Sequence, residues 1–186
     1  MKLLYGICFL VAMGLFYTGC GSNSELPIYG SQGADGSCNI QPYVLINQDS
    51  QFVKNVDLEG KVVLVDFFFT SCPSICPRMK SNLLNIHDAM AKDSDFMILS
   101  HTIDQKRDSV ARLRDYARKL GVDKARWQFV TAEKDTILSL AKSYLISASE
   151  DENAPGGFVH SGNFILLDRA GRIPVSYTHL TLPTKA

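Results

Sequence analysis

The chain has no excess of charge of either sign, because 19 Lys and Arg residues balance 19 Asp and Glu residues. It therefore lacks the basic surface that nucleic acid requires, and we expect no nucleic-acid partner. Cysteine is also scarce, and five residues, an odd number, do not indicate a disulfide framework. They allow at most one bridge or one thiolate metal site. With 186 residues, 46% of them hydrophobic, and no internal repeat, the chain predicts one globular domain.

Long apolar runs are missing except at the beginning of the chain. Residues 1–19 carry a single charge, at Lys2, which is typical of an export signal and short for a spanning helix of roughly 20 apolar residues. The run ends before Cys20, and the sequence there resembles a bacterial lipoprotein processing site with Cys20 as the lipid-bearing residue. Tyr17 stands where such sites usually have Leu, so an uncleaved membrane anchor is the alternative. Both interpretations predict an extracytoplasmic protein held at a bacterial membrane.

Three further segments follow. Residues 20–40 are rich in Gly and Ser and predict a flexible tether. Residues 41–175 hold the alternating apolar patterns of a folded domain. Residues 176–186 fit neither a strand nor a helix and resemble translated vector or adapter sequence, so we predict a non-native tail and a domain truncated at its C-terminal end.

The domain predicts an α/β fold. Turn residues between two short apolar runs, 43–46 and 51–53, predict a β-hairpin. Strands alternating with helices then indicate a central, mainly parallel sheet flanked by helices, with that hairpin as an extra N-terminal element. Strands are expected at 61–69, 96–99, 127–130 and 163–167, helices at 79–90, 110–120 and 137–145, and a polar loop at 147–157.

Two cysteines, Cys72 and Cys76, follow the apolar strand 61–69 directly. Pro77 suits the first position of a helix, so Cys76 is expected at a helix N-terminus, where free N–H groups and the dipole stabilise a thiolate. Four-residue spacing places both thiols on one face, within reach of a disulfide or a shared soft ion such as Cu(I) or Zn(II). Spacing alone does not choose between them. A dithiol between a central strand and a helix is the thioredoxin-like arrangement.

Two other residues bear on that choice. His160 follows a Gly-containing loop, from which it could bring an imidazole to the thiols; two sulfurs and one imidazole suit copper, although a lone histidine is more often structural. Asp66 is the only charge inside its apolar strand, six residues before Cys72. A buried carboxylate needs a partner, so Asp66 is either a strand-end residue bonded to backbone or a proton acceptor near the thiols, which would favour redox work.

The remaining polar residues have structural interpretations. His87 is expected at the boundary of a helix, and His101 at the end of a strand, bonded to nearby backbone. Asp104 and Asp108 are expected to start the second helix, because acidic residues suit helix N-termini.

Four segments of the domain form a specific combination of motifs: DFFFTSCPSICP at 66–77, HTIDQKRD at 101–108, WQFVT at 127–131 and VHS at 159–161. Together they resemble the Sco/SenC family, over roughly residues 40–173. The resemblance implies a membrane-tethered, thioredoxin-like domain outside the cytoplasm, with copper held by Cys72, Cys76 and His160. It also implies maturation of the binuclear copper centre of cytochrome c oxidase, by giving copper or by reducing the target's cysteines. The implied partners are the copper-bearing oxidase subunit, other copper chaperones or thiol reductants, and the membrane.

This resemblance favours a metallochaperone over an enzyme with turnover. One alternative is a thiol–disulfide oxidoreductase acting on extracytoplasmic proteins, with Cys72 and Cys76 as the redox-active pair and Asp66 moving protons. Against it, Val159 and His160 occupy the place where thioredoxins carry a proline opposite their dithiol. The other alternative is a copper or redox sensor, for which the sequence offers no separate output domain.

Overall fold

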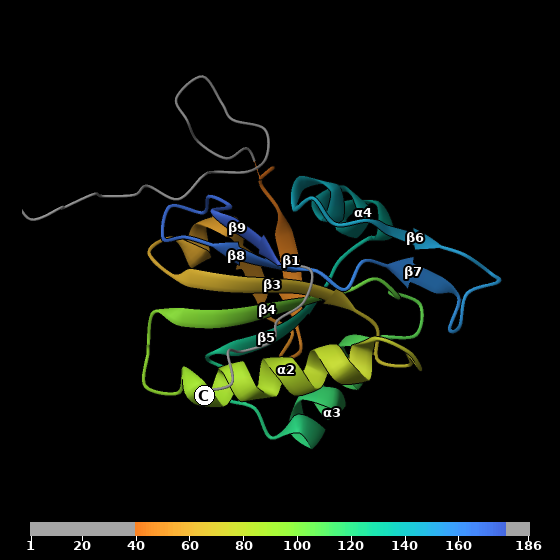
Figure 1. Cartoon of the computed structure of the whole chain (residues 1–186), viewed down its shortest axis with the longest axis horizontal. Helices are drawn as coiled ribbons and strands as arrows, with labels where there is room; N and C mark the ends of the chain where they lie inside the picture. Colours follow the sequence, from red (N-terminus) through yellow and green to blue (C-terminus); the bar gives the residue numbers. More distant parts are fainter. Residues whose placement is uncertain (1–39, 178–186) are drawn as a thin grey trace, which may run out of the picture.

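The computed structural model of the protein describes residues 40–177 (Figure 1). The predicted signal peptide or anchor, Cys20, most of the predicted tether and residues 178–186 of the predicted tail lie outside this range. Within residues 40–177, no helix is long and apolar enough to cross a membrane.

A seven-stranded sheet in the order β2-β1-β5-β4-β3-β8-β9 forms the centre of the fold. Its three central strands, β3, β4 and β5, are parallel, and every other pairing in it is antiparallel. The sheet is thus parallel at its centre and antiparallel toward both edges, one of which carries the predicted N-terminal hairpin. The strands are β1 (Val44–Asn47), β2 (Phe52–Lys54), β3 (Val62–Phe68), β4 (Phe96–Thr102), β5 (Trp127–Thr131), β8 (Phe164–Leu167) and β9 (Val175–Tyr177).

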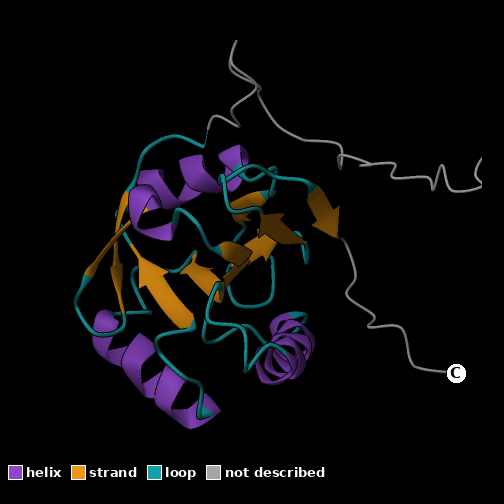
Figure 2. Cartoon of the chain, turned by 90° about the vertical axis from the view of Figure 1, so that its left-hand side faces the viewer, coloured by secondary structure: helices purple, strands orange, loops and turns teal. Residues whose placement is uncertain are grey.

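Helices cover both faces of the sheet (Figures 1 and 2), which confirms the predicted α/β architecture. α2 (Cys76–Ala89) and α3 (Val110–Leu120) lie on one face, and α4 (Lys134–Ser143) lies on the other. A short 3-10 helix, η2 (Asn55–Leu58), follows β2. The central strand β4 is buried along its whole length. Its apolar first half, 96–99, predicts a strand covered on both sides, and the structure extends this strand over the polar residues 100–102.

α3 spans residues 110–120, as the sequence predicts, but a serine caps it instead of the expected acidic residues. Ser109 is its N-cap, with its hydroxyl oxygen accepting the Arg112 N–H at 3.3 Å, and the first helical residue is Val110. Asp104 and Asp108 therefore do not start the helix; both are buried in the preceding loop. The prediction was wrong because these carboxylates are used in tertiary hydrogen bonds rather than at the helix terminus.

The predicted polar loop at 147–157 contains a strand. β6 (Ala148–Glu150) pairs antiparallel with β7 (Phe158–His160), with Ala148 opposite His160, in a separate two-stranded sheet. We call residues 148–160 the site hairpin. It projects beside α4, away from the main sheet (Figure 1). A three-residue strand with two exposed polar positions leaves no recognisable pattern in the sequence.

Candidate metal centre

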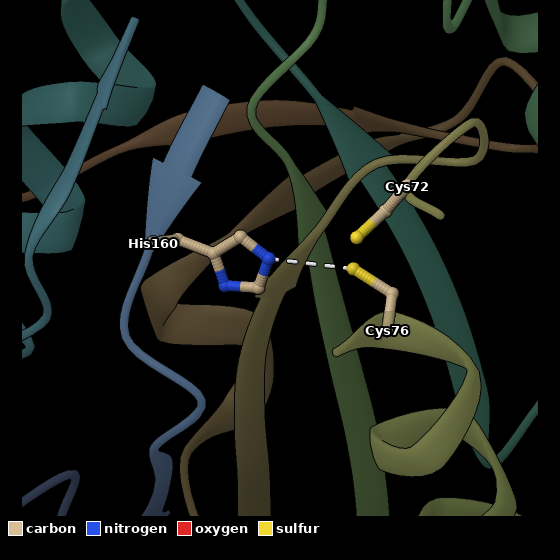
Figure 3. Close-up of side chains that lie close together, drawn as sticks. All are labelled: Cys72, Cys76 and His160. Carbon is tan, nitrogen blue, oxygen red and sulfur yellow. Dashed lines mark hydrogen bonds between the residues drawn. The ribbon is translucent and has the colours of Figure 1, made fainter. Parts of the chain in front are cut away.

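The dithiol lies at the carboxyl end of the central strand β3. We call residues 69–75 the dithiol loop; in it, the Cys72 N–H donates to the carbonyl oxygen of Phe69 at 3.2 Å. Cys76 is the first residue of α2, with Ile75 as N-cap and Pro77 in its first turn. Cys72 therefore lies in the loop and Cys76 at the helix start, as predicted, so the four-residue helical spacing does not relate the two thiols. The two sulfurs face each other because the loop turns back over the helix start (Figure 3).

The site hairpin brings an imidazole to this dithiol. His160 Nε2 lies 3.3 Å from Cys76 Sγ, and the ligand atoms of Cys72, Cys76 and His160 all lie within 4.8 Å of one another (Figure 3). Both cysteines are free thiols. His160 Nδ1 donates to the carbonyl oxygen of Ser161 at 3.1 Å, which fixes the tautomer and leaves Nε2 directed at the thiols.

This donor set fits a copper ion. Thiolate and imidazole bonds to an ion of this size are about 2.3 and about 2.0 Å, so atoms sharing one ion lie within about 4.6 Å of each other, close to the observed spread. Two soft sulfurs and an imidazole suit copper, whereas a structural zinc site usually has four protein ligands. Among residues 40–177 no other group of three such side chains is this close.

The two thiols differ in acidity. Burial raises the pKa of Cys76 well above its usual range, and its contact with Cys72 adds to the effect. Burial also acts to raise the pKa of Cys72, but hydrogen bonds from Cys76 and from the Ser74 and Cys76 backbone outweigh it and lower the pKa. The predicted thiolate at the helix start is therefore corrected: Cys72, half-buried, is the more acidic thiol. Burial lowers the pKa of His160, which favours the neutral imidazole that a metal requires.

Asp66 lies outside this three-residue group but shares a small pocket beneath α2 with Cys76. Only 2% of its surface is exposed, and the Ser100 hydroxyl donates to its carboxylate. Ser100 in turn accepts the Trp127 indole N–H at 2.9 Å. Burial raises the pKa of Asp66 to about 7. The strand-end interpretation is wrong, because Asp66 is in the middle of β3; its proton-acceptor role stays a prediction.

The other two described histidines serve the core. His101 is fully buried, stacks on Phe67 with ring centroids 4.7 Å apart, and donates from Nδ1 to the Asp66 carbonyl oxygen at 3.4 Å, the backbone bond that was predicted. His87 is buried rather than a boundary residue, because its Nε2 accepts the Asp123 N–H at 3.3 Å and ties α2 to the turn before β5.

Sequence reasoning missed the role of Asp108. This carboxylate, 1% exposed, accepts both the backbone N–H and the hydroxyl of Thr70, and it accepts the Thr102 hydroxyl at 2.7 Å. It thereby joins the dithiol loop region to the end of β4. The only signal was the acidic pair in segment 101–108, which also fits a helix start, so pattern alone could not identify a buried anchor.

Two glycines let the site hairpin pack directly on the dithiol loop. Gly156 has φ +87°, and a Cβ atom there would lie 2.6 Å from the Phe69 ring. A Cβ atom at Gly162, just after the hairpin, would lie 2.4 Å from the end of the Ile75 side chain. The turn of the hairpin and the residues just after its second strand are therefore both within contact distance of the dithiol loop.

Replacing Gly156 with alanine is expected to destabilise the domain by about 2–4 kcal/mol, from a left-handed backbone and overlap with a buried ring. Gly171→Ala is the matched control: its φ is also positive, +71°, but nothing lies within 4 Å, so about 1 kcal/mol is expected. Urea unfolding of both variants measures the difference. Equal losses would show that the hairpin is not tightly packed on Phe69.

The sheet, the dithiol at a helix start and the histidine facing it define a thioredoxin-like domain with a three-donor soft-metal site. The chain belongs to the SCO1/SenC family, whose model matches residues 32–186. This confirms the resemblance found in the four sequence segments, and the solved structures of the family confirm the fold.

Three of these structures illustrate the similarity. A SCO1/SenC family lipoprotein from Bacillus anthracis is 26% identical, with a TM-score of 0.69 over 76% of this chain and 84% of that one. ScoI from Bradyrhizobium japonicum, with copper bound, is 25% identical, with a TM-score of 0.66 over 74% and 87%. BsSco, a member of the Sco family of cytochrome c oxidase assembly proteins with a disulfide switch, is 25% identical, with a TM-score of 0.66 over 79% and 87%.

Proposed function

We propose that this protein is an extracytoplasmic metallochaperone that binds one copper ion through Cys72, Cys76 and His160. Its task would be to give that copper to the copper-bearing subunit of cytochrome c oxidase during assembly of the binuclear copper centre. The observation that carries the proposal is the 3.3 Å approach of His160 Nε2 to Cys76 Sγ, with all three donors within 4.8 Å. Copper in the ScoI structure and the family of BsSco support it.

The arrangement of the three donors suits a metal ion that the protein binds and then releases to an acceptor. Cys72 and His160 are half-buried while Cys76 is buried, so the site opens on the Cys72 and His160 side. Three protein donors leave a position at which a ligand of the acceptor can reach the ion before the chaperone releases it. The lowered pKa of Cys72 supplies a thiolate there.

A second function, thiol reduction of the target, is favoured by the acidity and exposure of Cys72. The Cys72 thiolate would attack a target disulfide, releasing one target thiol and leaving a mixed disulfide. Cys76 would then attack the Cys72 sulfur, giving up its proton to Asp66, releasing the second target thiol and closing a Cys72–Cys76 disulfide. A separate dithiol reductant would be needed to restore the two thiols.

We also propose that the domain is tethered to the outer face of a bacterial membrane, through a lipid on Cys20 or through an uncleaved segment 1–19. Support comes from the export-signal pattern and from the lipoprotein of Bacillus anthracis.

The proposed function predicts that Cys72→Ser/Cys76→Ser abolishes both copper binding and oxidase assembly. Purified wild-type domain should bind one copper per chain and the double variant none, because serine hydroxyls are poor ligands for a soft ion. In cells lacking the gene, the wild type should restore cytochrome c oxidase activity and the variant should not. If added copper restores oxidase activity in cells that carry the variant, the protein's function is copper delivery. If an added thiol reductant restores it, the function is reduction of the target's cysteines. Full oxidase activity with the variant would contradict both functions.

A further inference from the structure

One arginine joins the site hairpin to the rest of the molecule. The guanidinium of Arg107, in the loop between β4 and α3, donates to the carbonyl oxygen of Gly156 and lies over the Phe158 ring, 5.6 Å from its centroid. Phe158 and His160 are two residues apart on the same face of β7. Arg107 therefore contacts the hairpin next to the predicted copper ligand, without touching that ligand.

A buried carboxylate, that of Asp104, holds Arg107 in place. Its Nε donates to the carboxylate of Asp104, of which only 2% is exposed, and its backbone N–H donates to the same carboxylate at 3.2 Å. The Asp104 N–H donates to the Thr102 hydroxyl at 3.1 Å, and Thr102 donates to Asp108. Asp108 also accepts from Thr70 of the dithiol loop. The loop between β4 and α3 is therefore bonded to the dithiol loop through Asp108 and to the site hairpin through Arg107.

The hairpin has few other ties. Within the described residues, β6 and β7 pair only with each other, so no ladder of the main sheet fixes their position. Apart from the contact of His160 Nε2 with Cys76 Sγ at 3.3 Å, the hairpin's other polar tie among the described residues is a half-exposed ion pair between Lys134 of α4 and Glu150 of β6, at 2.6 Å. The Phe69 ring also packs against the rings of Phe158 and His160. Exposed ion pairs contribute little free energy to holding two segments together. Arg107, by contrast, is bonded to a buried carboxylate, so its guanidinium has a defined position from which to hold the hairpin.

We propose that Arg107, anchored by Asp104, is a positioning residue that sets the location of His160 relative to the Cys72–Cys76 dithiol. The inference rests on the proposed function for its role in copper binding, but the placement of the hairpin is a property of the metal-free chain. Lys106 provides a matched control, because it is exposed, adjacent and of the same charge. Its ammonium also acts on Glu150 of β6, whose pKa it helps to lower, so its removal tests the loss of a positive charge near the hairpin without the loss of the Arg107 hydrogen bonds.

The test compares Arg107→Ala, Arg107→Lys and Lys106→Ala, each with His160 intact and with His160→Ala. Copper affinity is measured by competition with a chelator. Arg107→Ala is expected to weaken binding about tenfold when His160 is present and to have no further effect when it is absent. Arg107→Lys should recover only part of the affinity, because one ammonium cannot reproduce the guanidinium fork. Lys106→Ala should leave the affinity unchanged.

A second measurement needs no copper. Amide hydrogen exchange of residues 148–160 in the metal-free protein should be about tenfold faster in Arg107→Ala, while the exchange of β3 and β4 amides and the dithiol reduction potential stay the same. Equal exchange and equal affinity in Arg107→Ala and wild type would overturn the inference, as would the same loss of affinity with and without His160. If the wild type binds no copper, the proposed function fails, and unchanged exchange would then overturn the positioning role independently.

Discussion

Replacing His160 with alanine is expected to weaken copper binding by about 100-fold or more while the fold and the dithiol remain intact. Loss of residues that merely support a metal ligand typically costs 10- to 100-fold in affinity, so loss of the ligand itself should cost at least about 100-fold. The side chain is half-buried at the mouth of the site, so its removal leaves no large core cavity. Chelator competition with Cu(I) and with Cu(II) measures the change.

His87→Ala is the control, because it removes an imidazole that is bonded to the turn before β5 rather than to the thiols. It should lower stability and leave the copper affinity of the folded protein unchanged. Thiol titration of His160→Ala should still find both Cys72 and Cys76 reactive. Wild-type copper affinity in His160→Ala, together with retained insulin-reductase activity, would overturn the copper-binding function and favour the oxidoreductase.

Asp66→Asn is expected to stabilise the protein by about 4 kcal/mol at pH 8.5 and to change its stability little at about pH 4. Burial raises the pKa of this carboxyl from 3.8 to about 7 in the folded protein. Each pKa unit corresponds to about 1.4 kcal/mol, so the ionised form is penalised by about 4 kcal/mol. Asparagine keeps the shape and the acceptor for Ser100 but cannot ionise.

The sign follows from which state binds the proton. Below pH 3.8 Asp66 is protonated in both states and contributes nothing. Between 3.8 and about 7 the unfolded chain releases this proton while the folded protein keeps it, so stability falls as pH rises. His101 acts in the opposite direction: burial lowers its pKa from 6.5 to about 4, so it destabilises the fold as pH falls through that range. Its contribution cancels when Asp66→Asn is compared with wild type at one pH.

Urea unfolding at both pH values measures the effect. Asp95→Asn is the control, since this carboxylate is exposed and its partners, Arg169 and the Ser94 hydroxyl, lie at the surface. Its removal should change stability by less than about 1 kcal/mol at either pH. An Asp66→Asn variant whose stability relative to wild type does not depend on pH would show that the carboxyl ionises freely in the folded state. Slower disulfide exchange in the same variant would support the proton-acceptor role.

The elements that could be predicted are those whose pattern is set locally. β3, β4 and β5 are rich in apolar residues because helices cover the sheet on both faces, and such segments are recognisable in a single sequence. The N-terminal hairpin was predicted from turn residues between two apolar runs and is confirmed. β6 and the roles of Asp104 and Asp108 could not be predicted, because a three-residue exposed strand has no periodicity and a buried loop carboxylate has the same local sequence pattern as a helix start.

The sequence by itself determined the dithiol between strand and helix, the alternation of strands with helices, and, through four matching segments, the family. Tertiary structure alone decided the geometry of the site: it places His160 Nε2 3.3 Å from a sulfur that is 84 residues away, and it makes Cys72 rather than Cys76 the acidic thiol. It also places the Arg107 guanidinium where it donates both to the buried Asp104 carboxylate and to the Gly156 carbonyl oxygen. Distant segments bring His160 to the dithiol and Gly156 to Arg107, while burial of Cys76 and hydrogen bonds within the dithiol loop and helix start separate the two thiol pKa values. These contacts exist only in the folded chain, so they cannot be recognised from the sequence pattern.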